Sequence, residues 1–103
     1  MKRAPRNRIV ADDTTVIRCA AGTGILREEV WQDDQVEVVR YNLAFINHFP
    51  CGADNGRVPG YDNSHGFRHR HCKGSVTSFT YQGYDVLLDR FLAEVADLRK
   101  EKA

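Results

Sequence analysis

The sequence predicts an α+β fold: an antiparallel sheet of four or five strands with a C-terminal amphipathic helix packed on one face. From Tyr84 to Lys100, apolar residues recur at helical spacing and form one stripe. Before that segment, several runs alternate apolar and polar residues, and turn-forming residues separate them. A single helix with one apolar stripe must bury it against another element, so we expect it to lie on the sheet.

The length and charge of the chain limit its function. At 103 residues the chain is expected to form one domain. Lys and Arg number 15 against 14 Asp and Glu, and the formal net charge is +1. This balance excludes a strong global field, so any contact with nucleic acid must use a local basic patch. Two basic clusters are present, Lys2, Arg3, Arg6 and Arg8 near the N-terminus, and Arg68, Arg70 and Lys73 farther along.

We divide the chain into residues 1–24, a flexible basic arm with a weak first strand, and residues 25–103, a single α+β domain. The arm contains Pro5 and shows no periodicity. The β-branched run from Thr14 to Ile17 favours a strand. Asp12-Asp13 is interpreted as a turn before it, and Gly22 and Gly24 break the chain after it.

The cysteines and the hydropathy pattern indicate a cytoplasmic protein with no membrane contact. Cys19, Cys51 and Cys72 are odd in number, form no CxxC pair and follow no secretory signal. We therefore expect reduced thiols, as in a cytoplasm. No apolar run approaches the roughly 20 residues that span a bilayer.

The next two runs, residues 25–32 and 36–47, predict a hairpin joined by a short polar turn. In the first run, Arg27, Glu29 and Trp31 share one face. In the second run the apolar phase slips at Val38-Val39, which indicates a β-bulge or a strand whose ends are covered on different faces.

The second half of the chain predicts shorter strands before the helix. Residues 57–61 form a short strand in which Pro59 indicates an edge or a bulge. Residues 67–80 alternate as one strand or two, with a kink at Lys73-Gly74. Asp85 near the start of the helix, and the basic residues near its end, suit the helix dipole.

The stretch GYDNSHGFRHRHCK, residues 60–73, holds most of the groups that can move protons or bind anions. On an extended strand, His69 and His71 point to the same side, about 7 Å apart, while the arginines beside them point away unless a twist or bulge brings one round. Two imidazoles beside guanidinium donors suit RNA cleavage, in which the 2′-OH is the nucleophile and no metal is required. We assign catalytic roles to His69, His71, Asp62 and Arg70, and substrate binding to Tyr61, Asn63, His65, Arg68 and Lys73.

Other interpretations of the same stretch remain open. Asp62, His65, His69 and His71 are all acceptable ligands for a divalent metal such as zinc. Their spacing is not a standard structural zinc pattern. A non-catalytic metal-binding or protein-interaction module, or solvated histidines with no role, are the alternatives to a cofactor-free enzyme.

The run GADNGRVPGYDNSHGFRHRH resembles the signature of TumE-type proteins, the toxin components of bacterial type II toxin–antitoxin pairs. The upstream RYNLAFIN, the strand that ends at Trp31 and the C-terminal amphipathic helix are also similar. The resemblance covers about residues 25–100 and is most specific in its middle third.

The resemblance implies a small cytoplasmic toxin that acts on RNA or translation and is neutralised by a helix-turn-helix antitoxin encoded beside it. The family positions carried over are Tyr61, Asp62, Asn63, His69, Arg70 and His71. The near-neutral charge departs from that of most RNA-cleaving toxins. An exposed edge near Pro59 would allow pairing with an antitoxin segment or with a second copy in a homodimer.

Overall fold

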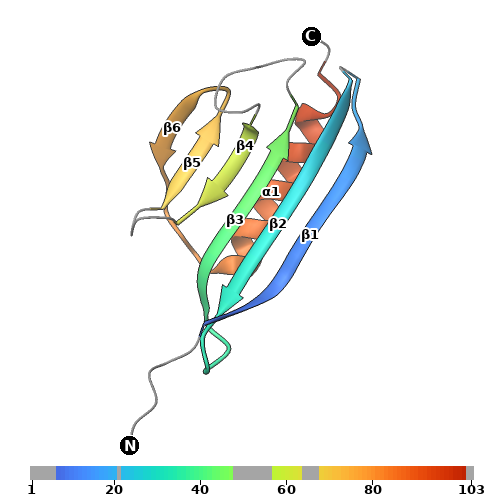
Figure 1. The fold of residues 1–103 in the computed structure, drawn as a ribbon. Helices are drawn as coiled ribbons and strands as arrows, with labels where there is room; N and C mark the ends of the chain where they lie inside the picture. Colours follow the sequence, from blue (N-terminus) through green and yellow to red (C-terminus); the bar gives the residue numbers. More distant parts are fainter. Residues whose placement is uncertain (1–6, 21, 48–56, 64–67, 102–103) are drawn as a thin grey trace, which may run out of the picture.

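The computed structural model describes residues 7–20, 22–47, 57–63 and 68–101. Within these ranges the chain forms one antiparallel sheet of six strands in sequential order, followed by one C-terminal helix (Figure 1). The α+β class and the helix are confirmed, but the predicted number of strands is too low. The elements are β1 (Arg8–Arg18), β2 (Thr23–Gln32), β3 (Val38–Ile46), β4 (Arg57–Asp62), β5 (His69–Cys72), β6 (Ser75–Ser78) and α1 (Tyr84–Leu98).

Strand β1 runs without a break through Asp12 and Asp13, so the turn predicted there is wrong. Asp12 pairs with Glu29 of β2, and Asp13 pairs with Glu28. The guanidinium of Arg27 lies 3.1 Å from a carboxylate oxygen of Asp12 and offsets the repulsion between the acids. A long backbone ladder with this neutralising contact outweighs the turn preference of the two aspartates.

The bulge predicted at Val38-Val39 is confirmed in β3. Trp31 of β2 pairs with Arg40, whereas the next residue, Gln32, pairs with Val38. Val39 is therefore the extra residue on β3, and it accounts for the change of apolar phase.

Strand β4 lies inside the sheet, between β3 and β5, so the edge predicted near Pro59 is wrong. The bulge interpretation of Pro59 is confirmed, because the register of β3 and β4 shifts between the Ala44–Gly60 pair and the Ile46–Arg57 pair. At this irregularity a proline, which has no N–H to donate, is tolerated within an interior strand.

The kink predicted at Lys73-Gly74 is a complete hairpin turn that separates β5 from β6. Lys73 has φ 50° and Gly74 has φ 87°, so both residues occupy the left-handed region. Two such residues form the type of two-residue turn that matches the twist of antiparallel strands. The segment therefore provides two short strands.

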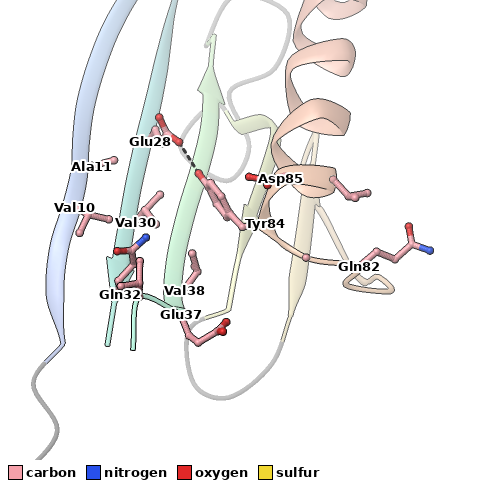
Figure 2. A pocket seen from close by; sticks show the side chains of 13 residues that line it. Val10, Ala11, Glu28, Val30, Gln32, Glu37, Val38, Gln82, Tyr84 and Asp85 are labelled. Carbon is pink, nitrogen blue, oxygen red and sulfur yellow. Dashed lines mark hydrogen bonds between the residues drawn. The ribbon is translucent and has the colours of Figure 1, made fainter. Parts of the chain in front are cut away.

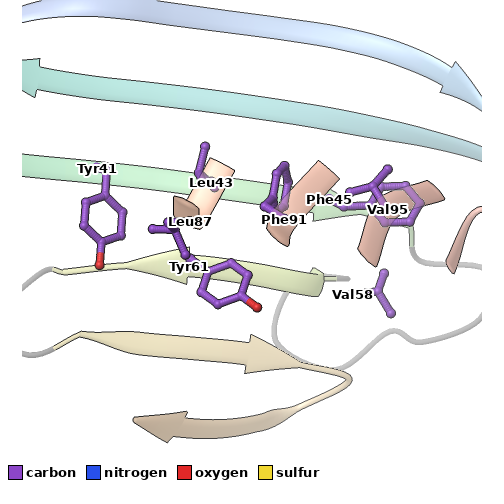
Figure 3. Close-up of a cluster of buried hydrophobic side chains, with 8 residues drawn as sticks. All are labelled: Tyr41, Leu43, Phe45, Val58, Tyr61, Leu87, Phe91 and Val95. Carbon is purple, nitrogen blue, oxygen red and sulfur yellow. The ribbon is translucent and has the colours of Figure 1, made fainter. Parts of the chain in front are cut away.

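Helix α1 packs on one face of the sheet, over β3 and β4, and we call this the helix face (Figures 1 and 3). The helix follows Gly83, whose φ of 103° suits glycine, and it ends at Leu98. Within the described residues no element covers the opposite face of the sheet, which we call the open face. The buried core between α1 and the sheet consists of Tyr41, Leu43, Phe45, Val58, Tyr61, Leu87, Phe91 and Val95.

Candidate functional site

Four side chains from β4 and β5 meet on the open face, and we call them the Asp62 cluster. Asp62 Oδ2 lies 2.9 Å from His71 Nε2 and 3.4 Å from Arg57 Nη1. Its other oxygen, Oδ1, lies 3.5 Å from His69 Nδ1. Asp62 is only 7% exposed, and a buried carboxylate needs such partners to offset its lost hydration.

The strand register explains why these residues meet. Asp62 pairs directly with His69, and Gly60 pairs with His71, so both imidazoles lie on the same face as the carboxylate. Gly60 has no side chain beyond the backbone, and a Cβ there would lie 3.1 Å from Arg57 Cδ. This glycine leaves room for the Arg57 side chain beside the cluster.

The two imidazoles differ in how far a substrate can reach them. The ring centroids are 6.2 Å apart at an interplanar angle of 63°. The side chain of His69 is 30% exposed, whereas that of His71 is 11% exposed. His69 is thus the more accessible proton-transfer group, and His71 is held more firmly against Asp62.

A pocket of about 150 Å³ adjoins the cluster on the open face. Asp62 and Arg57 form one part of its wall, and Arg40 and Trp31 contribute to the rest. Arg40 is exposed and forms no ion pair within the described part of the chain. The pocket therefore combines two carboxylates, those of Asp62 and Glu29, with two guanidinium groups and a half-buried indole ring.

A row of polar residues extends from the cluster across the open face. Asn42 pairs with Asp62, and its amide donates a hydrogen bond to Glu29 Oε1 at 3.4 Å. Glu29 in turn accepts Arg27 Nη2 at 3.1 Å. These contacts position the pocket wall opposite the histidines.

Arg70 and Tyr61, two of the sequence-predicted site residues, lie on the helix face and not in the cluster. The phenol of Tyr61 and the guanidinium of Arg70 both bind the carboxylate of Glu94 in α1. Arg70 Nε also donates to Tyr61 Oη at 3.0 Å. Because side chains alternate along a strand, Tyr61 and Arg70 lie on the helix face while the histidines lie on the open face. The structure therefore does not bring Arg70 to the histidines.

The electrostatics of this helix-face group are those of a structural contact. Burial, followed by the hydrogen bond to Glu94, raises the pKa of Tyr61 above its usual value. Burial alone would lower the pKa of Arg70, but the hydrogen bonds to Glu94 and Tyr61 outweigh it and raise that pKa. Arg70 therefore stays charged and joins the sheet to α1.

The other residues predicted to bind substrate have separate positions. Asn63 accepts a hydrogen bond from the N–H of Tyr41 and donates one to the carbonyl of Val39, both at 3.0 Å. Arg68 stacks over the ring of Tyr81, with its guanidinium carbon 4.5 Å from the ring centroid. Lys73 at the β5–β6 turn binds Glu101 at 3.0 Å, and His65 lies outside the described residues.

No set of three His, Cys, Asp or Glu side chains within the described residues is arranged to hold a metal ion. Instead, His69 and His71 each contact the carboxylate of Asp62 directly, through one ring nitrogen and one carboxylate oxygen. The fourth ligand of the metal alternative, His65, lies outside the described residues, so that ligand set stays untested.

The sequence interpretation missed Arg57, Arg40 and Trp31 as components of this site. One signal is present in the sequence, because strand alternation puts Trp31 on the same face as Arg27 and Glu29. The missing information was the register that sets Asn42 against Asp62 and the bulge that brings Arg57 to the same carboxylate.

Comparison with known protein families matches residues 3–99 to the family described as Toxin TumE. The match covers nearly the whole chain and confirms the resemblance noted in the sequence. Searches of curated proteins and of solved structures find no match. Among the described residues, no helix is long and apolar enough to cross a bilayer.

Proposed function

The chain belongs to the TumE toxin family, and we propose that it is the toxin of a type II toxin–antitoxin pair that cleaves RNA as a metal-independent endoribonuclease. The observation that carries this proposal is the Asp62 cluster, in which one buried carboxylate is shared by two imidazoles beside Arg57. Among the described residues, no element covers this face of the sheet, and His69, whose side chain is 30% exposed, is the part of the cluster that a long polymer can reach most readily.

The proposed reaction needs two proton transfers and no cofactor. One imidazole takes the proton of the 2′-OH, and the resulting O2′ attacks the adjacent phosphorus. The bond from phosphorus to O5′ breaks, and the second imidazole gives a proton to the leaving O5′. The products are a 2′,3′-cyclic phosphate and a 5′-hydroxyl. Asp62 orients both rings, because its two oxygens lie beside His71 Nε2 and His69 Nδ1.

The neighbouring pocket supplies groups that suit an RNA substrate. Arg57 and Arg40 offer donors to the phosphate, whose charge grows during the attack. The indole of Trp31 offers a surface on which a base can stack. In the near-neutral chain, Arg57 and Arg40 supply local positive charge for a polyanion, and Arg27 pairs with the Glu29 carboxylate of the same pocket wall.

As the toxin of such a pair, the protein would act in the cytoplasm and be held inactive by a helix-turn-helix antitoxin encoded by the neighbouring gene. The coding sequence beside the gene is the simplest check of this part of the proposal. A helix-turn-helix reading frame there, and tight co-purification of its product, are the expected results.

The test of catalysis is cleavage of an end-labelled RNA by wild type, His69→Ala and His71→Ala in the presence of EDTA. We expect wild type to form cyclic-phosphate ends, and each variant to lose about 10²–10⁴-fold in rate. Thr77→Ala, an exposed position on β6, is the matched control and should cleave like wild type.

Growth arrest on induced expression provides a second readout of the same variants. Retained arrest in both histidine variants would remove the ribonuclease proposal. Activity that requires added metal, or a melting temperature lowered by EDTA, would favour the metal-binding alternative.

A further inference from the structure

A groove runs along one side of α1 on the helix face. It consists of a pocket of about 620 Å³ beside the first turn of α1 (Figure 2) and one of about 200 Å³ farther along the helix. Glu28 of β2 lines both pockets, so they meet at this residue. We call this feature the α1 groove, with Val10, Leu26 and Val30 on its sheet side and Asp85, Leu88 and Leu92 on its helix side.

Two bulges at one end of the sheet explain why the groove is open. The register of β1 and β2 shifts between Ile9 and Ala11, which leaves Val10 as an extra residue, and Val39 is the extra residue on β3. Bulges increase the local twist of a strand pair. The ends of β1 to β3 thus extend past the first turn of α1 and remain uncovered by it (Figure 1).

Apolar side chains are exposed at both ends of the groove. Val36, which lines the large pocket, is 62% exposed and has φ 64°, a conformation that a β-branched residue rarely adopts. Asp33 holds this turn, because its Oδ1 accepts the N–H groups of Gln35 and Glu37. At the other end Leu92 is 46% exposed. A strained, exposed valine at the mouth of a pocket indicates a surface kept for contact.

The charged groups along the groove are acidic. Glu28, Glu37 and Asp85 line the large pocket, which has no basic residue in its lining, and Asp13 lines the smaller one. Arg27 also borders the smaller pocket, but its guanidinium binds Thr14 and Asp12. In a chain with a net charge of +1, this local excess of acid selects a basic occupant.

We propose that the α1 groove binds a positively charged amphipathic helix of a separate protein chain. Asp85, Leu88 and Leu92 recur at the i, i+3, i+7 spacing of one side of α1, which suits a second helix lying alongside. Such a helix would extend the helix layer over β1 and β2. The inference deepens the proposed function by naming the partner-binding surface of the toxin, and it makes no use of RNA cleavage.

The charge pattern argues against two other occupants. In a two-fold dimer the groove would meet itself, so the carboxylates of Glu28, Glu37 and Asp85 would face their own copies. The N-terminal residues 1–7 carry positive charge, but their apolar members are only Met1, Ala4 and Pro5. That segment therefore has the positive charge of the expected occupant but lacks the apolar stripe of an amphipathic helix.

The test uses two synthetic helices of about 18 residues, long enough to be helical, with the same leucine stripe and either lysine or glutamate on the flanks. Fluorescence anisotropy measures the binding of each to the full chain at low salt. We expect the lysine helix to bind at least about tenfold more tightly than the glutamate helix, and its affinity to fall as salt is added.

Three variants locate the binding surface. Val36→Asn, in which asparagine accepts the positive φ, and Glu37→Lys should each weaken the lysine helix by about tenfold. Val16→Asn is the matched control, because Val16 is 68% exposed but pairs with Ile25 on the open face, and it should change binding by less than about twofold.

Three results would overturn the proposal. The two helices could bind equally well, or the control could weaken binding as much as Val36→Asn does. Light scattering could instead reveal a dimer that Val36→Asn dissociates, which would assign the groove to a second copy. Because no step measures cleavage or growth arrest, each of these results leaves the ribonuclease proposal standing.

Discussion

Two neighbouring rows of residues cross the same strands on opposite faces of the sheet, and they have different roles. On the helix face, Tyr61 and Arg70 converge on Glu94 and tie the sheet to α1. On the open face, Asp62 gathers His69 and His71 beside a pocket. The full rows are Asp13, Glu28, Leu43, Tyr61, Arg70 and Thr77, and Asp12, Glu29, Asn42, Asp62, His69 and Ser78.

One short motif serves two purposes through strand alternation. Tyr61 and Asp62 are adjacent in β4, and Arg70 lies between the two histidines in β5, yet their side chains separate onto two faces. On the helix face, the carboxylate of Glu94 and its partners stabilise the fold. On the open face, the carboxylate of Asp62 and its partners form a candidate reaction site. Substitutions on the two faces should therefore separate stability from activity.

Among residues that the sequence alone did not indicate, the largest effect is expected at Arg57 on the open face. Arg57→Met removes a guanidinium 3.4 Å from Asp62 that also lines the pocket. We expect the rate of RNA cleavage to fall about 10²-fold, because phosphate stabilisation is lost. Single-turnover cleavage measures this effect, and Arg90→Met, an exposed arginine of α1, is the control. An unchanged rate in a folded Arg57→Met protein would exclude Arg57 from the reaction.

On the helix face, Glu94→Gln should reduce stability and spare activity. The substitution leaves Arg70, whose side chain is 24% exposed, without its anionic partner. We expect the free energy of unfolding to fall by about 2 kcal/mol. Urea denaturation gives this value, and cleavage per folded molecule should stay within about twofold of wild type. A large loss of cleavage at an equal folded fraction would place the Arg70 group in the reaction after all.

A smaller effect is expected where β3 and β4 are joined beside both rows. Asn63→Ala removes the hydrogen bonds to the backbone of Tyr41 and Val39. The unfolding free energy should fall by about 1–2 kcal/mol. Hydrogen exchange should show faster exchange of the Tyr41 amide in particular, and equal protection of that amide in the variant would contradict this role.

The effect that is smallest near neutral pH is a dependence of stability on alkaline pH, which arises on the helix face. Burial raises the pKa of Tyr41 from 10.0 to about 12, and it also raises the pKa of Tyr61, Tyr81 and Tyr84. Because the folded state favours the neutral phenols, their contribution to stability is complete below pH 10 and declines as the pH rises toward 12. Urea denaturation across this range measures the decline. Tyr41→Phe should lessen it, and an identical decline in that variant would contradict the assignment to Tyr41.

Periodicity alone predicted the helix, the bulge at Val39 and the shared face of His69 and His71. It did not predict the strand count, because β1 is exposed along most of its length and lacks a clear alternation. Nor did it predict that Lys73, a non-glycine residue, would take a positive φ and close a hairpin.

The site was predicted only in part for a related reason. Alternation places residues on a face, but the register between strands decides which residues become neighbours. The register that sets Asn42 against Asp62, and the bulge at Pro59 that brings Arg57 to the same carboxylate, depend on tertiary pairing. Arg70 is the opposite case. Its position between the two histidines in the motif suggested a catalytic role, but its side chain lies on the helix face and binds Glu94.

The most direct test of the central claim is the rate of RNA cleavage by Asp62→Asn, measured in EDTA under conditions where circular dichroism shows it folded. We expect a loss of about 10²-fold or more, because the amide replaces one of the two carboxylate oxygens that hold His69 and His71 with a nitrogen that cannot accept a hydrogen bond. A rate within about twofold of wild type, in a folded protein, would contradict it.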